Sequence, residues 1–346
     1  MRSFVCKCGN SLYFDSTQCV KCRTESGLCP NCRTVSPMLR QKPDGLRCGQ
    51  EGCGVLVHRC ANFAEIGCNR MVNCDDSVHG LMCDYCALTA IIPDLSVKGN
   101  CDKWKVLEQA KRRVLYILDL LGLPFRADAV HEIPSVSFEF KADAGVPVHT
   151  GHEDGVITIN IREADDVERE IARVSFHEPQ RTLVGHFRHE LGHYFWDRLV
   201  QGHREEECRE IFGDERNPDY SDAMTRYYET GPLPAWRENF ISAYATMHPW
   251  EDFAETFGAY LDMVTVLDTG RHYGLVACDF CDIDSMVATY QQLGIVANEL
   301  NRDMGLVDLV PEVFVAPIIR KMKFLHTLTT AAHGESGAPA GVLELA

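Results

Sequence analysis

The spacing of hydrophobic residues divides the chain into a turn-rich first part and a helical second part. Up to about residue 101 the chain consists of short, glycine-rich segments with little helical periodicity. Beyond Lys103, apolar residues recur every three or four positions, which predicts an amphipathic helix that ends at Gly122 and Pro124. The apolar positions of this helix are Val106, Leu107, Ala110, Val114, Leu115, Ile117, Leu118 and Leu121.

Further along the chain, the pattern predicts two strands and then several helices. Apolar and polar residues alternate over 135–140 and, more clearly, over 155–161, as they do in a half-buried strand. Between residues 201 and 221 the chain is polar, and we expect loops there. Helical periodicity is present over 181–200, 237–267 and 284–309.

Composition and charge exclude some classes of protein. Of the 346 residues, 45% are hydrophobic and 24% are charged. No run of 18 apolar residues occurs, so we expect no transmembrane helix and no membrane partner. The first residues lack the apolar segment of a secretory signal, which favours a cytoplasmic protein.

The formal net charge of −16 is unevenly distributed. Residues 1–101 contain 11 Lys and Arg and 9 Asp and Glu, a balance of +2. The remaining residues hold 23 of the 34 Lys and Arg and 41 of the 50 Asp and Glu, a balance of −18. This acidic part argues against a nucleic-acid surface there, whereas residues 1–101 leave a nucleic-acid role open.

Cysteines concentrate at the start of the chain: of 17, only Cys208, Cys278 and Cys281 come after Cys101. Clustered pairs in a reducing compartment are more typical of zinc sites than of disulfides. Two units have zinc-ribbon spacing, because paired thiolates on two turns can converge on one Zn²⁺. Their ligands are Cys6, Cys8, Cys19 and Cys22 in the first unit and Cys29, Cys32, Cys48 and Cys53 in the second.

A third cysteine unit is less regular. Cys83 and Cys86 form a firm pair, and we favour Cys60 and Cys68 as their partners, with Cys74, His58 and His79 as alternatives. Cys101 is not expected to bind metal. Cys278 and Cys281 have the spacing for a metal or redox pair, with Cys208 as a further ligand, but we favour buried structural cysteines because cysteine is among the most buried residue types.

The segment His189-Glu190-Leu191-Gly192-His193 carries the main candidate chemistry. On a helix, positions i and i+4 share a face, so His189 and His193 can both reach one metal ion. Glu190 then projects beside the metal, where a carboxylate can take a proton from an attacking water and return it to the leaving amine. A five-residue pattern also arises by chance on a helix, so a second element is needed.

That second element is HPWEDFAETFGAYLD, in which Glu251 and Glu255 are one helical turn apart. The combination resembles the thermolysin-like zincins, whose third ligand is a Glu on a later helix and whose neighbouring carboxylate orients a ligand histidine. The resemblance implies Glu251 as ligand and Glu255 as its supporting carboxylate, although the reverse assignment stays open. It also implies that the strand at 155–161 is an edge strand that pairs with extended substrate, although an ordinary strand within a sheet stays open.

Longer stretches resemble one family, the zinc-binding metallopeptidases with an N-terminal zinc-ribbon region. The specific blocks are HFRHELGHYFWDRL and HPWEDFAET, supported by GVITINIREADDVEREIARV, IPDLSVKGN, AKRRVLYILDLLGLP and NELNRDMGL. The expected fold is therefore α+β: zinc-ribbon modules over 1–101, a mostly helical zincin-like metallopeptidase domain with a small sheet over 102–332, and a flexible tail over 333–346.

The expected function is zinc-dependent hydrolysis of peptide bonds, with Glu190 as general base and acid. Tyr244 and His248 are the first candidates for the oxyanion donor, with Tyr227 and Tyr228 behind them, and His186 flanks the site. Counting ligands predicts one catalytic and about three structural Zn²⁺. The ribbons could recruit a peptide or protein substrate, or a protein partner; the alternative is a zinc-ribbon adaptor whose peptidase fold does not turn over.

Overall fold

The computed structural model describes residues 1–41, 45–76, 78, 80–127, 134–176, 182–310 and 314–336. The chain divides into two compact units, and each is considered by itself. Unit 1 comprises Met1–Arg113, Ser137–Thr150 and Thr158–Ile171, and unit 2 comprises Val114–Val136, Gly151–Ile157 and Ala172–Ala346. The expected change of character near residue 101 therefore falls within unit 1, and helix α2 (Asn100–Leu121) has residues in both units.

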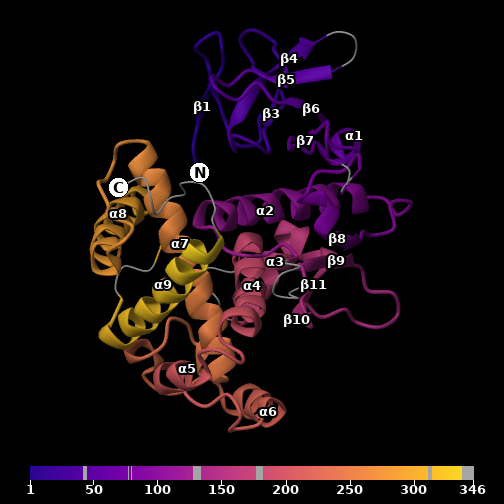
Figure 1. Cartoon of the computed structure of the whole chain (residues 1–346). Helices are drawn as coiled ribbons and strands as arrows, with labels where there is room; N and C mark the ends of the chain where they lie inside the picture. Colours follow the sequence, from indigo (N-terminus) through magenta and orange to yellow (C-terminus); the bar gives the residue numbers. More distant parts are fainter. Residues whose placement is uncertain are drawn as a thin grey trace. The chain divides into compact units, whose positions relative to one another are not determined.

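The N-terminal part of unit 1 is built from short antiparallel strands (Figure 1). A two-stranded ladder joins β1 (Phe4–Val5) and β2 (Ser11–Leu12). A five-stranded sheet has the order β3 (Ser26–Leu28), β4 (Val35–Gln41), β5 (Gly45–Cys48), β6 (Leu56–Arg59) and β7 (Met71–Asn73). The short helix α1 (Phe63–Ile66) lies between β6 and β7 in the chain, and the 3₁₀ turn η1 (Cys86–Leu88) follows β7.

One buried apolar cluster of this sheet consists of Cys29, Met38, Cys48, Val57 and Met71. Two of these five side chains are cysteines that the sequence assigns to a zinc unit. In short modules, cross-links between turns commonly add to the stability that the apolar core supplies.

A second sheet has the strand order β10 (Gly151–Glu153), β11 (Val156–Asn160), β9 (Ser137–Lys141) and β8 (Thr89–Ile91), in which β8 and β9 are parallel. The two strands expected from alternation are thus present as β9 and β11. The expectation that residues 155–161 form an edge strand was wrong, because β10 pairs with β11 and occupies the edge. After β11 come the 3₁₀ turn η2 (Ile161–Ala164) and helix α3 (Asp166–Phe176).

Unit 2 is mainly helical. Its helices are α4 (Leu183–Leu199), α5 (Glu205–Phe212), α6 (Tyr220–Thr230), α7 (Pro249–His272), α8 (Ile283–Asp303) and α9 (Ala316–Ser336), with 3₁₀ turns η3 (Trp236–Glu238) and η4 (Tyr244–Thr246). Helix α7 packs against α4, α5, α8 and α9 and is the central helix of this unit (Figure 1). Apolar side chains are buried on all sides of it, as expected for a helix surrounded by others.

Several helix boundaries differ from the pattern; for example, the helix expected over 284–309 ends at Asp303. The helix expected over 237–267 begins only at Pro249, because the side chain of His248 caps the helix and a proline disfavours helical backbone at the residue before it. The loop expected over 201–221 contains α5, whose Cys208 and Phe212, one turn apart, are buried. Helix α9 continues to Ser336, into the segment expected to be a tail, and residues 337–346 lie outside the described residues.

The contact between α4 and α7 is unusually close at one point. A Cβ added to Gly192 would lie 2.7 Å from the Cα and 3.0 Å from the carbonyl oxygen of Ala254. Only a glycine allows this approach, since the obstacle is backbone rather than a flexible side chain. Gly192 therefore sets the distance between the helix that carries the two histidines and the helix that carries Glu251.

We predict that Gly192→Ala destabilises the protein by about 1–3 kcal/mol, because overpacking forces α4 away from α7. The matched control is Gly258→Ala on α7, where an added Cβ would meet Arg188 and His189 only at 3.8 and 3.9 Å. That change should be neutral or stabilising by up to about 1 kcal/mol. Urea unfolding of both variants measures this, and equal stability of the two would contradict the packing argument.

Candidate metal centre and its surroundings

Three side chains from α4 and α7 converge in unit 2. His189 Nε2 lies 3.2 Å from His193 Nε2, and Glu251 Oε2 lies 3.0 Å from the former and 3.5 Å from the latter. His193 and Glu251 are buried, whereas His189 retains 17% side-chain exposure. Among the described residues, these three form the group in unit 2 whose donor atoms could share one ion.

The spacing of these donor atoms suits a tetrahedral zinc ion. Ligand atoms about 2.0–2.1 Å from zinc are about 3.3 Å apart at tetrahedral angles, and the three observed separations of 3.0, 3.2 and 3.5 Å bracket that value. Glu251 Oε2 is buried and accepts no hydrogen bond. A buried carboxylate oxygen without a donor favours a cation as its partner.

Each of the three candidate ligands contacts a neighbouring side chain. His189 Nδ1 lies 2.6 Å from Glu255 Oε1, so the imidazole donates there and leaves Nε2 free to accept a metal. The Tyr220 hydroxyl donates to Glu251 Oε1 at 2.6 Å, which turns Oε2 toward the histidines. The indole of Trp250 covers the His193 ring at a centroid distance of 3.7 Å.

The imidazoles and carboxylates of the centre shift one another's pKa values. Burial alone would lower the pKa of His189, but Glu251 and Glu255 raise this pKa well above its ordinary value. Burial would raise the pKa of Glu251, but His193 and His189 hold it well below the usual range. The carboxylate is therefore ionised over the physiological range, and two carboxylates face two imidazoles in a setting that attracts a cation.

Glu190, predicted as the base, is buried on α4 with 7% exposure. It lies near enough to Tyr220 for its charge to contribute to the raised pKa of that phenol, for which burial is the largest cause. Burial and the charge of Glu251 also raise the pKa of Tyr244, whose ring centroid is 6.1 Å from that of His189. Both phenols therefore keep their protons near neutral pH and remain hydrogen-bond donors.

The remaining predicted residues are placed differently. His248 caps α7: its Nδ1 accepts from Trp250 N at 3.2 Å and its Nε2 faces the Pro218 carbonyl at 3.3 Å, so both nitrogens have partners. Tyr227 contacts Tyr244, at 5.6 Å between ring centroids. His186 is not part of the metal-ligand group.

Sequence reasoning missed Tyr220 and placed it at the end of a loop. It is the first residue of α6, after the capping side chain of Asp219. Its partner Glu251 is 31 residues away, and no spacing rule connects the two. Asp219, a residue type that commonly caps helices, could have predicted the start of α6 from the sequence. It could not have predicted that the Tyr220 hydroxyl contacts Glu251.

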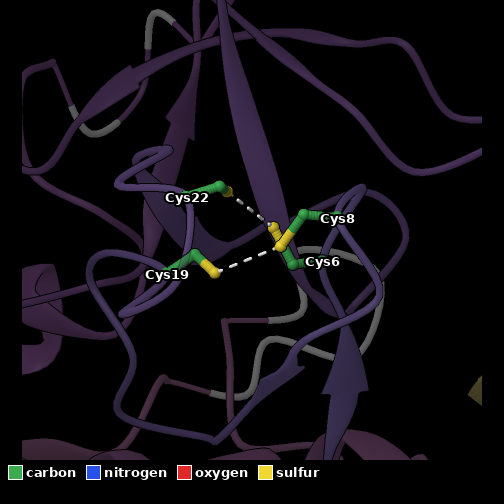
Figure 2. Close-up of side chains that lie close together, drawn as sticks. All are labelled: Cys6, Cys8, Cys19 and Cys22. Carbon is green, nitrogen blue, oxygen red and sulfur yellow. Dashed lines mark hydrogen bonds between the residues drawn. The ribbon is translucent and has the colours of Figure 1, made fainter.

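In unit 1, twelve cysteines gather in three groups of four. The first is Cys6, Cys8, Cys19 and Cys22, in which the sulfurs of Cys6 and Cys22 are 3.6 Å apart and those of Cys8 and Cys19 are 3.7 Å apart (Figure 2). Thiolates about 2.3 Å from one tetrahedral zinc are about 3.8 Å apart, whereas disulfide sulfurs are about 2.05 Å apart. The geometry therefore suits zinc and not disulfides.

The other two groups have the same geometry. The second contains Cys29, Cys32, Cys48 and Cys53. The sulfurs of Cys29 and Cys53 are 3.8 Å apart and those of Cys32 and Cys48 are 3.7 Å apart. The third contains Cys60, Cys68, Cys83 and Cys86, all buried. These are the four residues that the sequence favoured for the irregular unit.

The alternative ligands of the third group are elsewhere. Cys74 is exposed, and His58 Nδ1 is 3.0 Å from the Arg59 carbonyl oxygen. Cys101, which was not expected to bind metal, lies near the Glu65 carbonyl. His79 lies outside the described residues. 

The three late cysteines correct one expectation. Cys208 is buried, as a structural cysteine would be, but Cys281 is exposed and Cys278 is only partly buried. The expectation that both members of the Cys278 and Cys281 pair are buried was therefore wrong. Their loop precedes α8 at its cap, Asp282, and none of the three cysteines belongs to a metal-ligand group of the described residues.

Among the described residues, no helix is both long enough and apolar enough to cross a membrane.

Comparison with known proteins identifies a family for this chain. The model of the family described as "Putative zinc-binding metallo-peptidase" matches residues 100–328, and that of a zinc-ribbon domain matches residues 3–97.

Curated relatives cover nearly the whole chain. Uncharacterized proteins of Mycobacterium bovis and of two strains of Mycobacterium tuberculosis are each 36% identical to it over 340 residues, 95% of either chain. No solved structure matches significantly. The family match covers most of the chain and includes every residue of the histidine and glutamate cluster, so the chain belongs to this family of zinc-binding metallopeptidases and carries its zinc-ribbon domain at the N-terminus.

Proposed function

We propose that the protein is a zinc-dependent peptidase that hydrolyses peptide bonds at the cluster formed by His189, His193 and Glu251. The observation that carries the proposal is the convergence of His189 Nε2, His193 Nε2 and Glu251 Oε2 within 3.5 Å of one another. Two imidazoles and one carboxylate leave a fourth tetrahedral position for water, which is the ligand set of catalytic rather than structural zinc. A carboxylate, Glu190, directly follows the first of these histidines in the sequence.

The bound zinc would lower the pKa of a water molecule to about 7 and polarise the scissile carbonyl. Glu190 accepts the proton of the attacking water and passes it to the amine as the carbon–nitrogen bond breaks. The products are a carboxylate and an amine, so no other reactant is required. The buried position of Glu190 keeps the transferred proton away from bulk water.

Tyr244 is the oxyanion donor in this proposal. Its phenol is next to His189, and its raised pKa keeps the hydroxyl protonated as negative charge develops on the substrate oxygen. His248 is not assigned this role, since both of its ring nitrogens already have partners. Glu255 and Tyr220 orient His189 and Glu251, the role that neighbours of metal ligands commonly have.

For residues 1–101 we propose three structural zinc ions, one in each group of four cysteines. Four thiolates close the coordination sphere, so these ions support folding and do not bind substrate. Together with the centre in unit 2, the protein then holds four zinc ions.

Elemental analysis of the purified protein should find about four zinc ions per chain, by the count of ligand sets. In His189→Ala the count should fall by one, because two remaining ligands hold zinc poorly. The matched control is His186→Ala, one turn earlier on the same helix, which should keep all four. A wild-type count of three with no change in His189→Ala would contradict a zinc ion in unit 2.

Glu190→Gln should lower the kcat for peptide hydrolysis by a factor of about 10² to 10⁴, because the amide cannot accept the proton. Zinc content and thermal stability should stay near those of the wild type, since the two side chains have nearly the same shape. Cleavage of a peptide library followed by mass spectrometry measures the loss. Equal turnover by both proteins would rule Glu190 out as the base, whereas capture of peptides with no cleavage by either would favour the adaptor function.

Removal of metal should expose the cysteine groups in order of their burial. Under a gradual increase of chelator with an alkylating reagent present, Cys22, which is exposed, should be modified before Cys83 and Cys86, which are buried. Peptide mapping by mass spectrometry follows each site. Modification of the buried group first would show that burial does not control access to these ions.

A further inference from the structure

A row of aromatic rings leads from the candidate metal centre to the surface of unit 2. The ring centroid of Tyr244 is 6.1 Å from that of His189, and Tyr227 is 5.6 Å from Tyr244. Tyr228 follows at 5.7 Å from Tyr227 and is 67% exposed. Isolated exposed aromatic side chains need no explanation, but this one ends a continuous row that begins at a candidate zinc ligand.

The row is held in place from both sides. Tyr227 and Tyr228 are on α6, whose Arg226 donates to the Met247 carbonyl at 3.2 Å just before α7. The first residue of α6, Tyr220, donates to Glu251 at 2.6 Å. Helix α6 is thus hydrogen-bonded to the candidate metal centre through Tyr220 and to the residues before α7 through Arg226. The rings therefore lie on a fixed helix rather than on a loop.

An aliphatic side chain adjoins the same turn. The backbone N–H of Leu233 donates to the Thr246 hydroxyl of η4 at 3.3 Å, and Leu233 is 46% exposed. Tyr244 is in that same 3₁₀ turn. Leu233 is therefore an exposed apolar residue whose backbone contacts the turn that carries Tyr244.

The rings meet edge to face. The planes of Tyr227 and Tyr244 are 89° apart, and those of Tyr227 and Tyr228 are 81° apart. In this arrangement each ring contacts its neighbour through an edge or through one face. A further aromatic ring can therefore pack against the last one in the same edge-to-face geometry. A flat aromatic side chain matches such a row better than an aliphatic one does, because ring pairs gain energy beyond the area that they bury.

We propose that Tyr227 and Tyr228, with Tyr244, form a subsite that binds an aromatic side chain of the substrate next to the peptide bond that is cleaved. The inference rests on the proposed peptidase function and adds its substrate class: peptides with Phe, Tyr or Trp beside the scissile bond. Tyr244 joins the subsite to the reacting carbonyl, and Tyr228 is where the substrate side chain enters. Tyr227 and Tyr228 are specificity-determining residues and take no part in bond breaking.

The test uses the full-length zinc-loaded protein and one peptide sequence, with Phe, Leu, Ala or Arg on either side of the cleaved bond. The measured quantity is the ratio of kcat/KM for the Phe peptide to that for the Ala peptide. We expect the wild type to favour Phe, and Tyr228→Ala to reduce the ratio about 3- to 10-fold, the range for one aromatic pair. Tyr228→Phe should keep the preference because the ring remains.

A matched control is Tyr273→Ala, which removes another half-exposed tyrosine of unit 2 at the C-terminal cap of α7. It should leave the ratio at the wild-type value. Tyr227→Ala should act like Tyr228→Ala; if its circular dichroism shows misfolding, the exposed Tyr228 carries the test alone.

The outcomes separate the two proposals. Cleavage by the wild type without a preference for Phe, a preference for Arg, or a preference that Tyr228→Ala leaves intact would overturn the aromatic subsite and leave the peptidase function standing. No cleavage of any peptide by the wild type with four zinc ions bound would overturn the peptidase function and the subsite with it.

Discussion

The close packing of Gly192 on Ala254 is the constraint on which the candidate centre depends. At this point α4 and α7 touch through backbone, with space for no side chain between them. The two histidines are on α4 and Glu251 is on α7, so the separation of the helices sets the separation of the ligand atoms. The glycine inside the His-Glu-Leu-Gly-His segment therefore serves packing, while His189 and His193 are candidate metal ligands.

Around that contact, buried polar side chains hold α7 in place. Asp252 and Lys321 form an ion pair at 2.6 Å between α7 and α9, and Lys321 also donates to the Asn239 carbonyl. The Tyr260 hydroxyl is 3.0 Å from both His326 and Thr329 of α9. Buried charges and hydroxyls are costly unless they are paired, and here the pairing fixes one register between the two helices. These contacts also keep Glu251, on the same helix, in a fixed position.

Residues 1–101 reach stability by a different route. Strands of two to seven residues enclose a small apolar cluster, and the three groups of cysteines link turns that are far apart in the sequence. Cysteine pairs could be assigned to metal from spacing, because two thiolates on one tight turn have few other arrangements. For the irregular third unit spacing left several partners, and burial of all four sulfurs in one place selects among them.

The sequence by itself determined the features that depend on local periodicity: the helical face that carries His189 and His193, the strands β9 and β11, and the cysteine pairs. The start of α7 was misplaced, because the cap at His248 and Pro249 interrupts a pattern that looks continuous. Only the tertiary structure decided which strand is at the edge, that Glu251 faces the histidines while Glu255 holds His189 from the other side, and that Tyr220 reaches Glu251. These contacts join residues 31 to 66 positions apart, and the distance between such residues is set by helix packing, which no local pattern records.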